Sequence, residues 1–182
     1  MLGGVAGPVL SIELPEQLSD TALGDLRRLL SRLSPRFAET GVGQYDILVC
    51  NVHLGIGEDE TPEAHRPFLV SQAPNTGVNY SADWHSEVLD LKPYIGYEPT
   101  HEIHVAAMCN DRIDHMAAAH LAAAIMDVVG GIADVEVDEE HLPIVSDLPG
   151  LVGLIPHPWY TALGTPAFLR AWAAHPRFRL VK

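Results

Sequence analysis

Apolar residues recur at two different spacings, and these spacings predict a strand, a helix and a second strand in the first third of the chain. Residues 8–14 (PVLSIEL) form a short β-rich run, whereas the leucines of residues 18–34 recur at helical spacing. Ser19 is placed to cap that helix, and Pro35 is placed to end it. Residues 44–54 (QYDILVCNVHL) carry apolar side chains on both faces, which is typical of a strand covered on both sides.

The second half of the chain repeats this alternation around one alanine-rich helix. Residues 84–97 begin with period-2 alternation, which predicts a strand, and end in a Pro and Gly-rich turn. Residues 101–109 (HEIHVAAMC) predict another strand. A helix is expected to begin near Arg112 and to end at the glycine pair 130–131, after which residues 131–137 (GIADVEV) return to a strand pattern.

The end of the chain predicts a loop and a last helix. Residues 154–164 (LIPHPWYTALG) are rich in proline and aromatic residues and are expected to form a loop. Thr165 is a good N-cap and Pro166 suits the first helical position, so a helix should follow and should end before Pro176.

The order of these elements predicts the fold class. Residues 55–83 are rich in Gly, Pro, Asn, Ser and acidic side chains, so they are expected to form a long surface excursion. Residues 1–182 are otherwise expected to form a single domain, because no repeat or linker divides them. The pattern favours an α+β fold, a two-layer α/β sandwich with a ferredoxin-like core and an added C-terminal helix.

Charge narrows the range of partners. With 11 basic against 24 acidic residues the net charge is −13, which opposes binding to nucleic acid and to anionic membranes. Such a surface favours a basic protein as partner. The N-terminus does not read as a signal peptide, and the longest apolar run, residues 116–126, is shorter than the roughly 20 residues that span a bilayer, so a cytoplasmic protein is expected.

Two histidines in the alanine-rich helix raise the question of a metal or acid/base site. His120 falls within the apolar stripe and His115 on the opposite side, so a straight helix cannot present both to one metal ion. Asp114 lies in the first turn, where a carboxylate favours the helix dipole. A metal or small-enzyme site formed between elements, from His104, Asp114 and His115 with Glu102, stays open as the alternative. No cofactor signature is present, and no cofactor is expected.

Acidic and aromatic side chains near the end of the chain suggest a protein-binding surface. Residues 134–140 (DVEVDEE) hold five acidic residues in seven, and alternation would place Asp134, Glu136 and Asp138 on one strand face beside Glu139. Trp159 and Tyr160 are either anchors for a partner or side chains folded back on the core. A solvated acidic face with no partner is the alternative interpretation of the same run.

Three segments resemble a known family. GPVLSIELPEQLS, MCNDRIDHMAAAHLAAAIMDVVGGIADVE and AFLRAWAAHPRFRLVK together resemble a family of small bacterial proteins described as a domain of unknown function. The middle segment is also similar to elements of small immunity proteins of bacterial toxin systems. The resemblance implies a non-enzymatic, acidic protein-binding module, an immunity protein that inhibits a cognate toxin.

Overall fold

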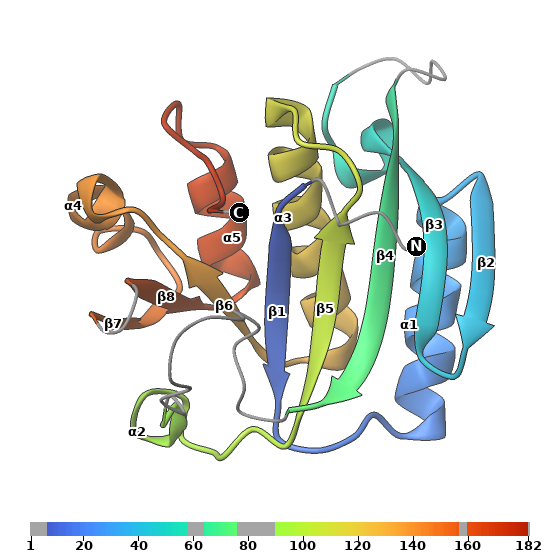
Figure 1. Ribbon diagram of the computed structural model, residues 1–182, viewed down its shortest axis with the longest axis horizontal. Helices are drawn as coiled ribbons and strands as arrows, with labels where there is room; N and C mark the ends of the chain where they lie inside the picture. The colour runs from blue at the N-terminus through green and yellow to red at the C-terminus, as the bar shows by residue number, and fades with distance from the viewer. Residues whose placement is uncertain (1–6, 58–63, 76–89, 157–159, 182) are drawn as a thin grey trace, which may run out of the picture.

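A computed structural model describes residues 7–57, 64–75, 90–156 and 160–181. Its central feature is one antiparallel sheet of eight strands in the order β2-β3-β4-β5-β1-β6-β8-β7 (Figure 1). The strands are β1 (Val9–Leu14), β2 (Arg36–Gly41), β3 (Gln44–Cys50), β4 (His65–Pro74), β5 (His101–Ala107), β6 (Ile132–Glu136), β7 (Leu151–Ile155) and β8 (Thr161–Gly164). The expected α+β class is confirmed.

The helices join these strands. The α-helices are α1 (Asp20–Leu33), α2 (Lys92–Ile95), α3 (Arg112–Val129), α4 (Leu142–Val145) and α5 (Pro166–Ala173). Two short 3-10 helices accompany them, η1 (Asn51–Leu54) and η3 (Glu139–His141). No helix within the described ranges is long and apolar enough to cross a membrane.

The expected ferredoxin-like core is recognisable once the β2–β3 hairpin is set aside. The remaining elements β1-α1-β4-β5-α3-β6 have the chain order βαββαβ, and their four strands are neighbours in the sheet. The hairpin extends one edge of this core, and β8 and β7 extend the other.

Helices α1, α3 and α5 cover one face of the sheet, which gives the two layers (Figure 1). The side chains of Leu10, Ile12, Ile103 and Val105 are at most 1% exposed and pack in one core cluster with the alanines of α3. A second, small cluster of Leu91, Ile155 and Leu163 lies apart from that core. Leu163 faces the other side of the sheet from its neighbour Ala162, which belongs to the main core, so this second cluster lies on the face without the long helices.

Both ends of α3 form as the sequence predicts. Asp111 is the N-cap and forms a capping box with Asp114, and the helix ends at Gly130, whose φ is 79°. Gly131 follows with a φ of 95°, and a Cβ atom there would lie 2.7 Å from Cγ2 of Ile12. Glycine is therefore required where the chain turns back against β1.

Two expectations about the sheet are wrong. Residues 65–74, inside the segment expected as a surface excursion, form β4 between β3 and β5, where His65–Ser71 pair with β3 and Phe68–Pro74 pair with β5. The expected loop 154–164 instead contains the end of β7 and the whole of β8, which pair with each other. Residues 92–95, in the turn expected at the end of residues 84–97, form the short helix α2. Residues 58–63, 76–89 and 157–159 lie outside the described part.

The cap of α1 gives a first testable prediction. The Ser19 hydroxyl accepts a hydrogen bond from the backbone N–H of Ala22 at 3.2 Å. Ser19→Ala should lower the free energy of unfolding by about 1 kcal/mol, measured by urea denaturation, because a helix N–H loses its acceptor. Ser31→Ala makes the same change within α1, where alanine is the better helix former, and should be neutral or slightly stabilising. Equal losses in both variants would contradict a role for the cap.

Candidate functional site

The acidic run predicted as a row on one strand face is divided between two places. Strand β6 ends at Glu136, and the Val137 side chain turns into the core while its N–H donates to the backbone oxygen of Tyr160 at 2.8 Å. Asp138 then occupies the N-cap position of η3, whose first residue is Glu139. Asp134 and Glu136 share one face of β6 as predicted, but Asp138 does not continue the row, because the strand stops before it.

The residues predicted to bind a partner also differ in their exposure. Glu136, Asp138 and Glu139 are exposed, whereas Asp134 is half-buried on the sheet. Tyr160 is half-buried and packs against the main core, and Trp159 lies outside the described residues. Tyr160 therefore folds back in part on the core. For Trp159 both interpretations, an anchor for a partner or a side chain folded back on the core, stay open.

The metal alternative loses its proposed ligand set. His104 faces away from Ile103 and Val105, which pack beside α3, so it lies across the sheet from Asp114 and His115. Within the described ranges no three His, Cys, Asp or Glu side chains are grouped so that they could hold a metal ion. Periodicity placed His104 correctly on its strand, but it could not show that α3 covers the opposite face.

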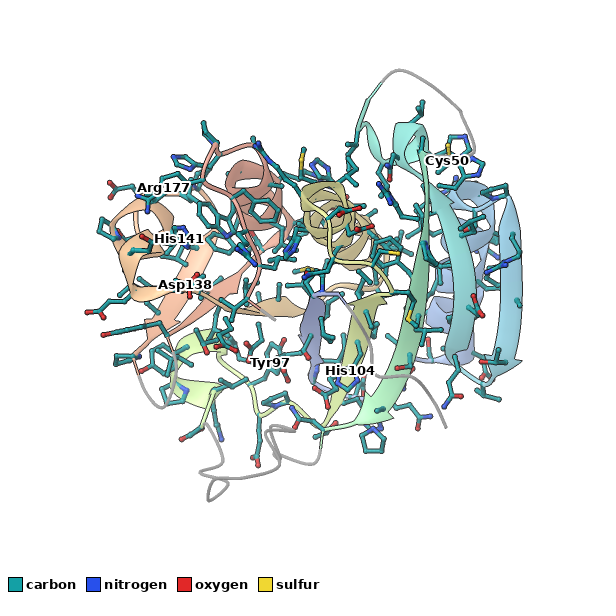
Figure 2. All side chains as sticks on the ribbon, turned by 45° about the horizontal axis from the view of Figure 1, so that its top comes forward. Cys50, Tyr97, His104, Asp138, His141 and Arg177 are labelled. Atoms are coloured by element: carbon teal, nitrogen blue, oxygen red, sulfur yellow. The ribbon has the colours of Figure 1, made fainter. Side chains whose placement is uncertain are left out.

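A pocket of about 530 Å³ lies where the N-terminus of α3, η3 and the C-terminal segment meet. Figure 2 shows Asp138, His141 and Arg177 gathered on this side of the molecule. The pocket is bordered by charged groups of both signs. Its lining residues are Asn110, Arg112, His115, Asp138, Glu140, His141, Pro176, Arg177, Phe178 and Arg179.

His141 lies in the wall of this pocket and is 5% exposed. Its ring meets the edge of Trp172 at a centroid distance of 5.3 Å. Nδ1 lies 3.7 Å from Asp138 Oδ2 and Nε2 lies 3.6 Å from Glu140 Oε1. Nδ1 has no hydrogen-bond partner within the described part of the chain. Nδ1 is therefore a buried polar atom that faces the Asp138 carboxylate at a distance too long for a hydrogen bond.

His115 holds the other wall in place. The backbone N–H of Leu180 donates to Nδ1 at 3.2 Å, so Nε2 carries the proton and donates to Asn110 Oδ1 at 3.1 Å. Burial lowers the pKa of His115, and the nearby Arg179 guanidinium lowers it further. The neutral ring therefore ties the C-terminal segment to the start of α3. Sequence reasoning placed His115 on the outer side of the helix because it could not show that residues 178–180 cover it.

The arginines of the pocket differ in their partners. Arg177 Nη2 pairs with Glu140 Oε2 at 3.1 Å across the opening. Arg112 reaches only the backbone oxygen of Pro176, at 3.5 Å, and Arg179 forms no ion pair among the described residues. Both are exposed.

A second group of polar side chains lies on the sheet face away from α3. Glu13 pairs in register with Glu102, and Ser11 pairs with both His104 and Asp134, so four titratable side chains occupy two adjacent rows. The Glu13 side chain is 3% exposed, and Nδ2 of Asn75 donates to its Oε2 at 2.7 Å. We call Glu13, Glu102, His104 and Asp134 the carboxyl cluster.

Burial governs the protonation of the carboxyl cluster. It raises the pKa of Glu13 to about 8, with further increases from the charges of Asp134 and Glu102. Burial and the charge of Glu102 raise the pKa of Asp134 to about 7. Tyr97, whose hydroxyl donates to the backbone oxygen of Glu13 at 2.7 Å, has its pKa raised by burial to about 12. The cluster therefore holds protons near neutral pH.

Sequence reasoning named Glu102 and His104, whose side chains lie 3.1 Å apart (Oε2 to Nε2), but it did not find Glu13. The available signal was one charged residue inside the otherwise apolar strand VLSIEL. Without the pairing of β1 with β5 and β6, nothing connected Glu13 with Glu102 and Asp134.

Comparison with known proteins gives a family but no activity. The chain belongs to a family of unknown function, DUF6368, whose model matches residues 6–182. No curated protein matches the chain. No solved structure matches it either.

Proposed function

We propose that this member of the DUF6368 family is a non-enzymatic protein-binding module that recognises a basic partner protein. One observation carries the proposal. The exposed carboxylates of Glu136, Asp138 and Glu139 follow one another at the end of β6 and the start of η3, and Asp138, Glu139 and Glu140 line an open concavity. We call these four residues the acidic face.

Charge and exposure support this proposal. The side chains of Asp138 and Glu140 are 54% and 68% exposed, so a partner can reach them. A net charge of −13 attracts a basic protein over distances of about a Debye length, and exposed rim charges mainly raise the rate of association. The similarity of the middle segment to small immunity proteins suggests a toxin as the partner, with inhibition through coverage of its active site.

The test begins with capture of partners by the tagged full-length chain from its own producing cells, with low-salt and high-salt washes. One basic protein should be retained at near-equal stoichiometry and released by salt. Asp138→Lys with Glu139→Lys should weaken its binding at least tenfold, because two attractions become repulsions. The matched control reverses two exposed carboxylates elsewhere, Glu16→Lys with Asp90→Lys, and should weaken binding less than about threefold.

Two results would contradict the proposal: retention of no protein in stoichiometric amount, or equal weakening by both double variants. The inhibitory form of the function has its own readout. The captured protein should be an enzyme whose activity falls on addition of one equivalent of this chain.

A second candidate function rests on the carboxyl cluster. Carboxyl groups that hold protons near pH 7 beside a histidine and carboxylate pair are typical of general acid/base sites. This candidate predicts an activity that Glu13→Gln abolishes while the protein stays folded. It needs no metal ion.

A further inference from the structure

The pocket between α3, η3 and the C-terminal segment combines two carboxylates that also belong to the acidic face, Asp138 and Glu140, with arginines that protein binding by the acidic face does not use. Its cationic side chains come from α3 and the C-terminal segment, as Arg112, Arg177 and Arg179. Its carboxylates, Asp138 and Glu140, come from η3 and the residue before it. The two signs are thus held by different elements around one cavity, and they meet where Arg177 pairs with Glu140.

Two of the three arginines of this pocket lack a carboxylate partner, which is uncommon in the rest of the molecule. Of the six arginines elsewhere, Arg32 has no carboxylate within 4.0 Å in the described part, whereas Arg27, Arg28, Arg36, Arg66 and Arg170 each have one. Among the described residues Arg112 and Arg179 have none, although the chain contains 24 acidic residues. Guanidinium groups bind carboxylates strongly, so two arginines without a carboxylate partner at one cavity indicate an anion-binding end.

The part of the pocket that carries Asp138 and Glu140 is suited to binding a cation. Asp138 and Glu140 place carboxylates on either side of His141, whose buried Nδ1 has no hydrogen-bond partner among the described residues. Glu140 is held by Arg177 at 3.1 Å, but Asp138 is free of arginine partners in the described part. A ligand cation here gains the Asp138 carboxylate, which lies 3.7 Å from Nδ1 of His141, and a nearby ring.

We infer that this pocket binds a small zwitterion of the basic amino-acid type, with its carboxylate at Arg112 and Arg179 and its cationic end at Asp138. The volume of about 530 Å³ lies within the range of small-molecule sites, and His141 and Phe178 supply ring surface between the charged ends. The same chemistry is offered by a free basic amino acid and by a chain that ends in one.

The experiment is a titration of the full chain followed by amide and imidazole NMR signals. L-arginine and the tripeptide Gly-Gly-Arg are the probes, and they distinguish a free ligand from a chain terminus. The signals of Leu180 and His141 should shift and saturate with at least one probe, whereas those of Gly43, far along the sheet, should not. Agmatine lacks the carboxylate and citrulline lacks the side-chain charge, so each should bind at least about tenfold more weakly than arginine.

Substitutions in the pocket test which residue binds each end of the ligand. Arg179→Ala should weaken binding of the probe at least about fivefold, and Asp138→Asn should remove the preference for arginine over citrulline. Arg32→Ala is the matched control, because Arg32 is an exposed arginine in the last turn of α1 without an ion pair in the described part. It should change the affinity less than about twofold.

The inference is overturned if neither probe shifts the pocket signals, or if agmatine and citrulline bind as tightly as arginine. It is also overturned if Arg179→Ala and Arg32→Ala have equal effects in folded protein. The proposed binding of a basic partner is tested separately, because Arg179→Ala changes this pocket and leaves all four residues of the acidic face unchanged.

Discussion

Glu13→Gln is expected to stabilise the protein by about 4 kcal/mol at pH 9 and by about 2 kcal/mol at pH 6. The substitution keeps the size of the side chain and an oxygen that can accept from Nδ2 of Asn75. It removes only the ability of the buried group to ionise. The free energy of unfolding from urea titrations at the two pH values measures the effect.

The sign follows from the direction of the pKa shift. In the folded protein the pKa of Glu13 is raised from 4.5 to about 8, chiefly by burial. The stability contributed by the protonated carboxyl is fully present below pH 4.5 and is lost as the pH rises to about 8, because the unfolded chain releases the proton first. Glutamine has no proton to lose, so the gain grows across this window and levels off above it.

The control is Glu16→Gln, the same change at an exposed position two residues after β1. It should alter the free energy of unfolding by less than about 0.5 kcal/mol at either pH. A Glu13→Gln variant that is less stable than the parent at pH 9, or equally stabilised at both pH values, would show that the Glu13 carboxyl is not kept neutral by burial.

The carboxyl cluster also shows how far local sequence patterns reach. Caps and breakers act within one turn of a helix, so Ser19, Asp111 and Gly130 could be read correctly from their immediate neighbours. The order of the core elements other than β4, namely β1, α1, β5, α3 and β6, follows from the same local patterns, because each of these elements has its own periodicity. Glu13 and Asp134 come together only through the register of β1 with β6, which no local pattern encodes.

Strand β4 was missed although its sequence does contain a local strand pattern. Its sequence HRPFLVSQAP alternates at Phe68 and Val70, which are at most 1% exposed, but prolines and polar residues surround them. The loop-like composition of residues 55–83 therefore led to the prediction of a surface excursion, although the short alternation at Phe68 and Val70 marks the buried face of a strand. Tertiary pairing on both sides, with β3 and β5, supplies the stability that local propensity does not.

The pocket was missed for a related reason. Its walls come from residues 110–115, 138–141 and 176–179, so its geometry depends on how the C-terminal segment crosses the start of α3. Sequence reasoning singled out the acidic run but not the arginines near the end of the chain. Their neutralisation of one another, as in the pair Arg177 and Glu140, is visible only in three dimensions.

Asp114→Ala is expected to lower the free energy of unfolding by about 3 kcal/mol, the second of the two large effects. The Asp114 side chain is 1% exposed, and its Oδ2 accepts from the backbone N–H of Asp111 at 2.7 Å. Its Oδ1 lies 3.5 Å from Nε of Arg66 on β4. Alanine would remove the reciprocal bond of the capping box and leave the Arg66 guanidinium, which is 22% exposed, without its buried carboxylate.

The matched control lies at the other end of the same helix. Asp127 also pairs with an arginine, Arg170, but both side chains are about half exposed. Asp127→Ala should therefore cost less than about 1 kcal/mol, since an exposed pair is screened by solvent and a carboxylate near a helix C-terminus opposes the dipole. Asp114→Asn should fall between the two, because the amide oxygen can still accept from Asp111 while the charge facing Arg66 is gone. Equal losses for Asp114→Ala and Asp127→Ala would mean that burial of Asp114 adds nothing to the attachment of α3 to β4. The start of α3, on which the pocket is built, would then be held by its contacts with the C-terminal segment, among them the His115 bond to Leu180.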